Sequence, residues 1–126
     1  MQRRTLLASF AASALLPAAT PAAASVVMTG DHQRLAVTDR GTGKPVVLIH
    51  GWSLGAAIWT LQTDWLVSQG LRVVAYDRRS HAGSDKPATG YDFDTLAADL
   101  AQVLDQLDLH NATLVGHSMG AGEVAR

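Results

Sequence analysis

Three short, mostly apolar runs predict the strands of a central sheet. They lie near residues 46–50, 71–76 and 112–116, and turn-forming residues bound each of them. An apolar run without polar alternation is typical of a strand covered on both faces, as in a parallel sheet. Two shorter segments, 26–28 and 35–37, predict a pair of strands joined by a turn at Gly30 and Asp31.

The segment 93–107 predicts the clearest helix of the chain. Asp92 or Asp94 is placed to cap its first turn. Its apolar residues recur every three to four positions and form one face, which consists of Leu96, Leu100, Val103, Leu104 and Leu107.

A second helix is predicted over residues 58–68, closed by Gly70. Trp59 and Trp65 are expected in the core. The apolar residues at helical spacing are Ile58, Leu61, Trp65 and Leu66. Because strands and helices alternate, we expect an α/β fold with a mostly parallel sheet and helices on both faces.

The last strand leads directly into Gly116-His117-Ser118-Met119-Gly120, which fits the pattern Gly-x-Ser-x-Gly. This pattern is typical of a nucleophile elbow, a sharp strand-to-helix turn that exposes a serine. Both glycines are required because a Cβ at either position would press on neighbouring backbone. The motif predicts Ser118 as a nucleophile and the Met119 backbone N–H as an oxyanion donor. A glycine–serine turn without chemistry is the alternative interpretation.

A second motif overlaps the first. Residues 120–125, Gly-Ala-Gly-Glu-Val-Ala, fit the dinucleotide fingerprint G-x-G-x-x-A. That fingerprint follows its strand directly, whereas here residues 117–119 intervene, and its acidic residue about 20 positions later is absent from this sequence. A dinucleotide-binding module is therefore a remote alternative.

Composition narrows the classes of function. Apolar residues make up 48% and charged residues 17% of the chain, with a formal net charge of −1, as in a folded globular protein without a nucleic-acid-binding surface. Cysteine is absent, and no two histidines have ligand spacing on a helix. We expect no metal site and no cofactor.

Residues 1–24 have the three regions of a secretory signal peptide. Arg3 and Arg4 form a basic start, residues 6–16 are apolar, and an Ala-x-Ala site precedes Ser25. The paired arginines fit either a twin-arginine signal or an ordinary basic start. Spanning a bilayer takes roughly 20 apolar residues, so we expect no stable membrane anchor. The prediction is export to the periplasm or the medium, with residues 25–126 forming the domain.

Three stretches resemble the α/β-hydrolases, and among these the cofactor-free haloperoxidase and arylesterase (perhydrolase) branch. They are VLIHGWS (47–53), YDRRSHAGSDKP (76–87) and TLVGHSMGAGEVAR (113–126). The resemblance implies the N-terminal half of that fold and a serine hydrolase of small carboxylic esters that forms an acyl-enzyme on Ser118. It also implies a perhydrolysis side reaction, and it makes the Trp52 backbone N–H the oxyanion-hole partner of Met119. Substrate identity and oligomeric state do not follow from it.

The sequence departs from the family pattern at two places. Ser80 and Ala82 stand where the family usually has glycine, and Gly83 is expected to compensate in part. The family's triad continues with Asp or Glu and then His, and neither follows Ser118 here. By itself the chain is therefore expected to be inactive and poorly soluble, as a truncated fragment, with a pseudoenzyme as the less favoured alternative.

Upstream side chains are not expected to replace the missing partners. Asp77 and Arg79 are expected to hold their loop by hydrogen bonds. Structural or solvated roles are expected for the candidate histidines, which are His50, His81, His110 and His117.

Overall fold

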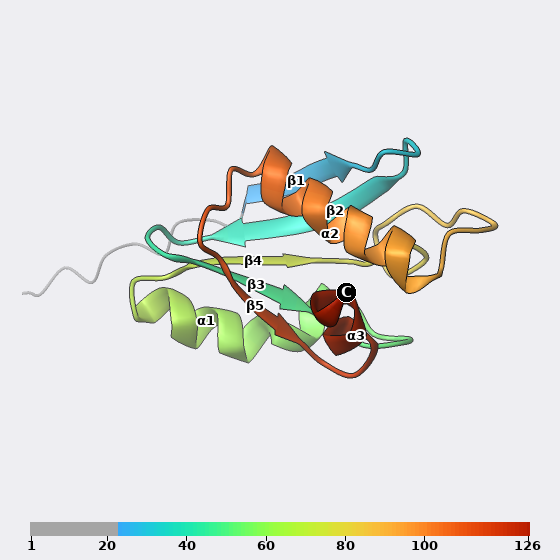
Figure 1. Ribbon diagram of the computed structural model, residues 1–126. Coiled ribbons are helices and arrows are strands. Elements are labelled where there is room, and N and C mark those ends of the chain that lie inside the picture. The colour runs from blue at the N-terminus through green and yellow to red at the C-terminus, as the bar shows by residue number, and fades with distance from the viewer. Residues whose placement is uncertain (1–22) are drawn as a thin grey trace, which may run out of the picture.

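The computed structural model describes residues 23–126, and a five-stranded sheet runs through this part of the chain (Figure 1). Its strands are β1 (Ala23–Met28), β2 (Arg34–Arg40), β3 (Pro45–Ile49), β4 (Arg72–Tyr76) and β5 (Thr113–Gly116). Their order across the sheet is β1-β2-β4-β3-β5. Strand β3 pairs in parallel with β4 and β5, whereas β2 pairs antiparallel with β1 and β4. The predicted α/β fold is confirmed. Its sheet was expected to be mostly parallel, and within the described residues it has two parallel and two antiparallel strand pairs.

Alternate residues of the central strands supply two separate cores. Val47 and Ile49 of β3 point to the face covered by α2 (Phe93–Gln106) and α3 (Met119–Ala125). Val46 and Leu48 point to the opposite face, where η1 (Ala56–Trp59) and α1 (Thr60–Ser68) pack. Because both faces are covered, β3 needs apolar side chains at every position, which explains its unbroken apolar run.

Helix α2 follows its prediction closely. Asp92 caps it, and the Asp92 carboxylate accepts a hydrogen bond from the Thr95 backbone N–H at 2.9 Å. Leu96, Leu100 and Val103 are buried against the sheet. The predicted apolar face is the face that packs.

The predicted apolar stripe of the 58–68 segment is wrong at Ile58, Leu61 and Trp65, which are exposed. Leu61 is 79% and Trp65 is 63% exposed, so Trp65 does not belong to the core. The chain enters α1 through the 3₁₀ turn η1, which has about 3.0 residues per turn in place of 3.6 and so rotates the residues that follow. Thr63 faces the sheet in their place, whereas Leu66, which the predicted stripe included, packs against the core.

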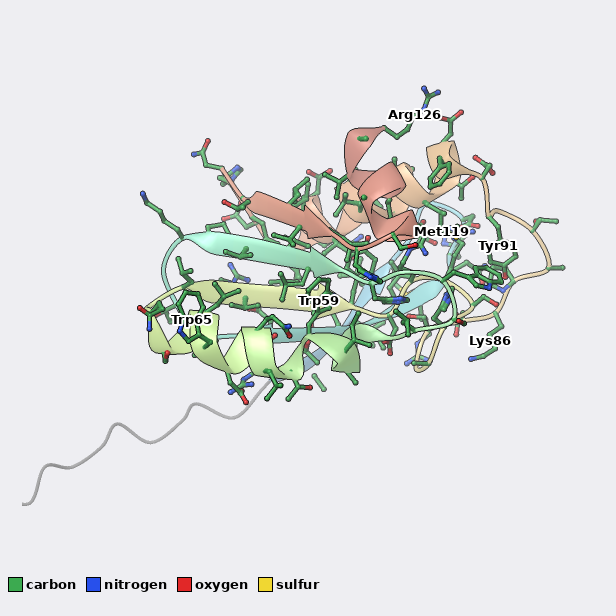
Figure 2. All side chains as sticks on the ribbon, turned by 90° about the horizontal axis from the view of Figure 1, so that it is seen from below. Trp59, Trp65, Lys86, Tyr91, Met119 and Arg126 are labelled. Carbon is green, nitrogen blue, oxygen red and sulfur yellow. The ribbon has the colours of Figure 1, made fainter. Side chains whose placement is uncertain are left out.

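Trp59 meets its prediction, because it packs against the core beside α1. Figure 2 shows Trp65 at the far end of the sheet from Met119 and Tyr91, which lie at the carboxyl ends of the parallel strands.

Most of the predicted signal peptide lies outside the described residues. Ala23 and Ala24 are described, and they pair with Asp39 and Thr38 at the start of β1. Within residues 23–126, no helix has the length and apolar character needed to cross a bilayer.

Candidate active site

Ser118 occupies the turn between β5 and α3. Its backbone angles are φ 54° and ψ −119°, and the residue is exposed. A non-glycine residue in such a sparsely populated region costs about 1–3 kcal/mol, which the surrounding structure must supply. Two hydrogen bonds of 2.9 Å close the turn, from Gly120 N–H to the His117 carbonyl and from Ala121 N–H to the Ser118 carbonyl.

The flanking glycines of the motif allow close backbone contact, as predicted. A Cβ on Gly116 would lie 2.4 Å from the Gly120 carbonyl oxygen. A Cβ on Gly120 would lie 2.5 Å from the Ile49 carbonyl oxygen. Both distances are far inside van der Waals contact, so α3 can pack against β3 and β5 only with glycine at these two positions.

The loop after β3 runs directly beside Ser118. The His117 backbone N–H donates to the Ile49 carbonyl at 2.9 Å, which joins the ends of β5 and β3. A Cβ on Gly51 would lie 3.1 Å from the Ser118 Cβ. The Gly51 backbone therefore lies against the serine.

Trp52 and Met119 line one small cavity. Its volume is about 10 Å³, which is about the volume needed for one water molecule. The Trp52 side chain is 60% exposed and meets the His81 ring edge-on, with 5.5 Å between the ring centroids. The fold thus brings both predicted oxyanion-hole residues to the turn that carries Ser118, although they are 67 positions apart (119 − 52).

The backbone of the 77–90 loop is strained at the two positions that the sequence predicted, Ser80 and Ala82. Ser80 has φ 68° and Ala82 has φ 38°, in the region that favours glycine. Gly83 does not have a positive φ, so it does not compensate in the expected way. It allows close packing instead, because a Cβ there would lie 3.1 Å from the Ala36 Cβ.

His50 and His81 are structural residues, as expected. The Nε2 atom of His50 accepts the Arg78 backbone N–H at 3.0 Å, so Nδ1 carries the ring proton and donates to the Gly51 carbonyl at 2.7 Å. Burial lowers the pKa of His50 below its ordinary value. The His81 ring is likewise engaged by the Arg79 carbonyl at 2.9 Å and the Ser53 N–H at 3.2 Å.

His110 and His117 are both exposed. His110 is solvated, as expected, with its side chain 83% exposed and paired with Asp108. His117 was expected to be packed or hydrogen-bonded; it is exposed, so the packed role is not found. Within the described part of the chain, no histidine is hydrogen-bonded to the Ser118 hydroxyl.

A buried ion pair links the end of β4 to α3, and the sequence motifs did not reveal it. Arg78 Nε donates to Glu123 Oε2 at 2.7 Å, and the Tyr76 hydroxyl donates to Glu123 Oε1. The two charged side chains are 2% and 0% exposed. Burial raises the pKa of Glu123, while the Tyr76 hydrogen bond and the Arg78 charge act in the opposite direction. The only available signal was a glutamate that follows the Gly-x-Ser-x-Gly motif by a turn of helix.

A second ion-pair network holds the loop after β4, as predicted for Arg79 and Asp77. Arg79 binds Asp99 of α2 through two hydrogen bonds of 2.6 and 2.7 Å, and it also binds Asp31. The Arg79 hydrogen bond lowers the pKa of Asp31 to about 2. Asp77 accepts the Ala56 N–H at 2.7 Å and the Gly83 N–H at 2.9 Å.

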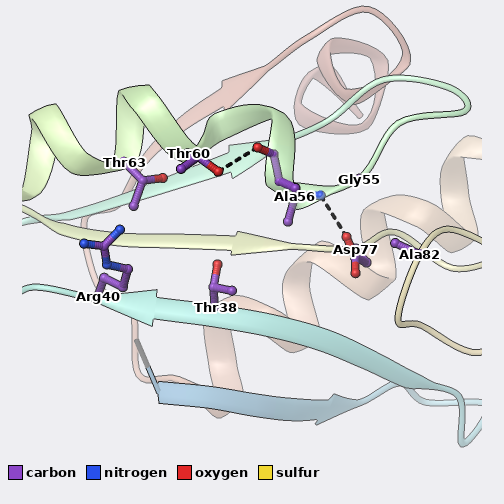
Figure 3. Close-up of a pocket in the computed structure, with 9 residues that line it drawn as sticks. Thr38, Arg40, Gly55, Ala56, Thr60, Thr63, Asp77 and Ala82 are labelled. Carbon is purple, nitrogen blue, oxygen red and sulfur yellow. Dashed lines mark hydrogen bonds between the residues drawn. The ribbon is translucent and has the colours of Figure 1, made fainter. Parts of the chain in front are cut away.

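A larger pocket of about 380 Å³ lies between η1, α1 and β2 (Figure 3). It is lined by residues such as Thr38, Arg40, Thr63 and Asp77, and none of the three candidate site residues contributes to it. Asp77 is held there by its hydrogen bond to Ala56 (Figure 3). This pocket is therefore separate from the Ser118 turn.

The dinucleotide motif has a different use in the structure. Gly120 and Gly122 lie inside α3, not in a turn before a helix. A Cβ on Gly122 would lie 2.6 Å from the Phe93 ring, so this glycine serves helix packing. Across residues 23–126, no group of three or more His, Cys, Asp or Glu side chains is arranged to hold a metal ion.

Comparison with known proteins decides the family. The family model described as alpha/beta hydrolase fold matches residues 44–126. The chain belongs to the α/β-hydrolase family. A non-heme chloroperoxidase from Streptomyces lividans is 49% identical over 79% of this chain and 37% of its own length.

Two solved enzyme structures are similar to this chain over most of its length. A bromoperoxidase from Bacillus anthracis has a TM-score of 0.80 at 48% identity, over 82% of this α/β-hydrolase chain and 38% of the bromoperoxidase. An esterase from Exiguobacterium antarcticum has a TM-score of 0.79 at 39% identity, over 81% and 38% of the two chains. The chain is thus similar to enzymes of the haloperoxidase and esterase branches, and it spans less than two fifths of their length.

Proposed function

We propose that this chain carries the nucleophile and the oxyanion hole of a serine hydrolase that acts on carboxylic esters. The single observation behind this proposal is the Ser118 turn. It holds an exposed serine in a strained backbone conformation, against the Gly51 backbone and at the start of α3. Similarity to an esterase and to haloperoxidases supports the same chemistry.

The roles follow from the geometry of acyl transfer. Ser118 Oγ attacks the ester carbonyl carbon, and the carbonyl π electrons move to its oxygen. The backbone N–H groups of Trp52 and Met119 donate to that oxyanion. Collapse of the tetrahedral intermediate expels the alcohol, and water then releases the acid from the acyl-enzyme.

The general base and its acidic partner are proposed to lie outside this chain. His50 and His81 have both ring nitrogens engaged, so neither is free to take the Ser118 proton. The resemblance implies an Asp or Glu and then a His, in that order along the chain. No metal or other cofactor enters the proposed reaction, and the proposed substrate is a small-molecule ester.

Perhydrolysis is a second proposed activity of the same site. The observation that favours it is the similarity to a chloroperoxidase and a bromoperoxidase. If hydrogen peroxide replaces water as the second nucleophile, its oxygen bonds to the acyl carbon, Ser118 leaves, and the product is a peracid. The peracid then oxidises halide in solution.

Labelling with a fluorophosphonate tests the assignment of Ser118. In the protein at the length its gene encodes, the probe should label one serine, and Ser118→Ala should abolish labelling and lower kcat by about 10³-fold or more. His110→Gln, at an exposed site away from the turn, is the matched control and should change neither. Unchanged ester turnover in Ser118→Ala refutes the proposal.

Export, with cleavage before Ser25, is also proposed. Support comes from the basic, apolar and Ala-x-Ala order of residues 1–24. Mass spectrometry of the exported protein should find Ser25 at the N-terminus. If Arg3 and Arg4 belong to a twin-arginine signal, replacing both with lysine should block export.

A further inference from the structure

We propose that Arg78 and Glu123 are positioning residues that set the spacing between the two oxyanion-hole donors, the backbone N–H groups of Trp52 and Met119. The inference rests on the proposed function, because it assigns the buried ion pair a role at that site. Neither residue touches the reacting atoms in this scheme.

The sheet alone does not set this spacing. Pairing of β3 with β5 ends at Ile49 and Gly116, and one further bond joins His117 N–H to the Ile49 carbonyl at 2.9 Å. Trp52 and Met119 each lie three positions beyond these strand ends (52 − 49 and 119 − 116). Something beyond the strands must hold the two amides in register.

Arg78 is hydrogen-bonded to both segments that carry the donors. Its backbone N–H donates to His50 Nε2 at 3.0 Å, and His50 lies two positions before Trp52. Its side-chain Nε donates to Glu123 Oε2 at 2.7 Å, and Glu123 lies one helical turn after Met119. Arg78, two positions after the end of β4, therefore contacts both the segment that leads to Trp52 and helix α3.

The connection is stiff because it is buried and charged. The Glu123 side chain is 0% exposed, and His50 as a whole residue is also 0% exposed. The second carboxylate oxygen of Glu123 is occupied by the Tyr76 hydroxyl, so the group is held from two directions. Charge-assisted hydrogen bonds are shorter and stronger than neutral ones, and removal of one partner leaves the other charge buried without compensation.

Catalysis is sensitive to the geometry that this pair controls. A displacement of about 1 Å can lower a rate by about 100-fold, and loss of one oxyanion donor lowers kcat by about 10²- to 10³-fold. Ground-state binding of the ester depends much less on these two amides. Loosening the pair should therefore lower kcat and leave KM unchanged.

The double variant Arg78→Met with Glu123→Gln tests this in the protein at its encoded length. The double variant removes both charges, so no unpaired charge stays buried. The glutamine side-chain oxygen can still accept a hydrogen bond from the Tyr76 hydroxyl. We expect a cooperatively folded protein with an unchanged KM and a kcat lowered by about 10- to 100-fold. If the pair served only to stabilise the fold, the folded double variant would have wild-type kcat. That result overturns the proposal.

Two further variants keep the test decisive. Arg78→Lys retains the charge but loses the Nε geometry, and it should show a smaller fall in kcat; wild-type kcat in this variant also counts against the proposal. The matched control is Arg72→Met with Asp39→Asn, which removes the ion pair at the opposite end of β4, with contacts of 2.6 and 3.0 Å. It should leave kcat unchanged.

Failure of the proposed function is distinguishable from failure of this inference. If Ser118→Ala retains activity, the nucleophile is wrong, whatever the double variant does. If Ser118→Ala is inactive while the folded double variant has full activity, the serine assignment stands and only the positioning role fails.

Discussion

Ser80 and Ala82 each hold a backbone conformation that glycine adopts without strain. Their φ angles are 68° and 38°. We expect Ser80→Gly and Ala82→Gly each to stabilise the fold by up to about 1 kcal/mol, the usual size of such an effect at a left-handed position. Urea unfolding would measure it. Ala101→Gly, on the exposed side of α2, is the control and should destabilise by about 1 kcal/mol, because helix interiors disfavour glycine. If Ser80→Gly and Ala82→Gly both destabilise the fold, the two backbone positions are not strained.

His50 should make stability depend on pH. Its pKa is lowered from the ordinary 6.5, chiefly by burial, so the folded state binds the proton less well than the unfolded state. The stabilisation is full above pH 6.5 and is lost as the pH falls toward the lowered pKa. Protonation at Nε2 would also break the hydrogen bond from Arg78.

The free energy of unfolding, measured from pH 8 to 5, checks this expectation. It should decrease below about pH 6.5, and His50→Asn should flatten that decrease. His110→Gln alters an exposed side chain and should leave the profile as it is. An equal slope in wild type and His50→Asn would show that another group is responsible.

Helix α2 depends on the Asp92 side chain that caps its first turn. Asp92→Ala should destabilise the fold by about 1 kcal/mol, because the Thr95 N–H loses its acceptor and the first turn loses a favourable negative charge. Asp105→Ala, near the other end of the same helix, should have no destabilising effect. Thermal unfolding of the two variants compares them directly, and equal losses would argue against a capping role.

Apolar periodicity predicted the buried face of α2 but not that of α1. The face of α2 followed from its own periodicity, because the helix is regular from a side-chain cap to its end. The face of α1 did not, because a 3₁₀ turn at 56–59 precedes it and the sheet below accepts Thr63 where periodicity favoured Leu61 and Trp65. A change in helical pitch leaves no clear trace in an apolar pattern.

Strand β5 affects the behaviour of the whole molecule. It is the last strand in the sheet order, and Val115 is 37% exposed. An apolar strand with open N–H and C=O groups promotes edge-to-edge association. The 126-residue chain expressed alone should therefore aggregate as concentration rises, and a fluorophosphonate should fail to label Ser118 in it.

Light scattering across a concentration series tests the role of this edge. Val115→Lys should delay aggregation by placing a charge on β5, whereas Ala101→Lys, which adds the same charge to α2, should not. If both variants behave alike, net charge and not the strand edge controls solubility. Stoichiometric labelling of Ser118 in a soluble monomer would contradict the expected inactivity.

The sequence by itself determined the features that depend on a few neighbouring residues. Apolar runs specified β3 and β4, because a strand covered on both faces needs apolar side chains throughout. A shorter apolar run before Gly116 also specified β5. Two glycines around Ser118 specified its tight turn, because any Cβ there would meet backbone atoms at about 2.4–2.5 Å. The amphipathic period specified α2.

Only the tertiary structure decided the contacts between distant residues. Arg78 and Glu123 are 45 positions apart, and nothing near either residue indicates that it is buried or paired. The state of His50 depends likewise on the Arg78 backbone, 28 positions away. Such pairs form because folding removes two charged or polar groups from water together, and which groups meet depends on how strands and helices pack, not on local preference.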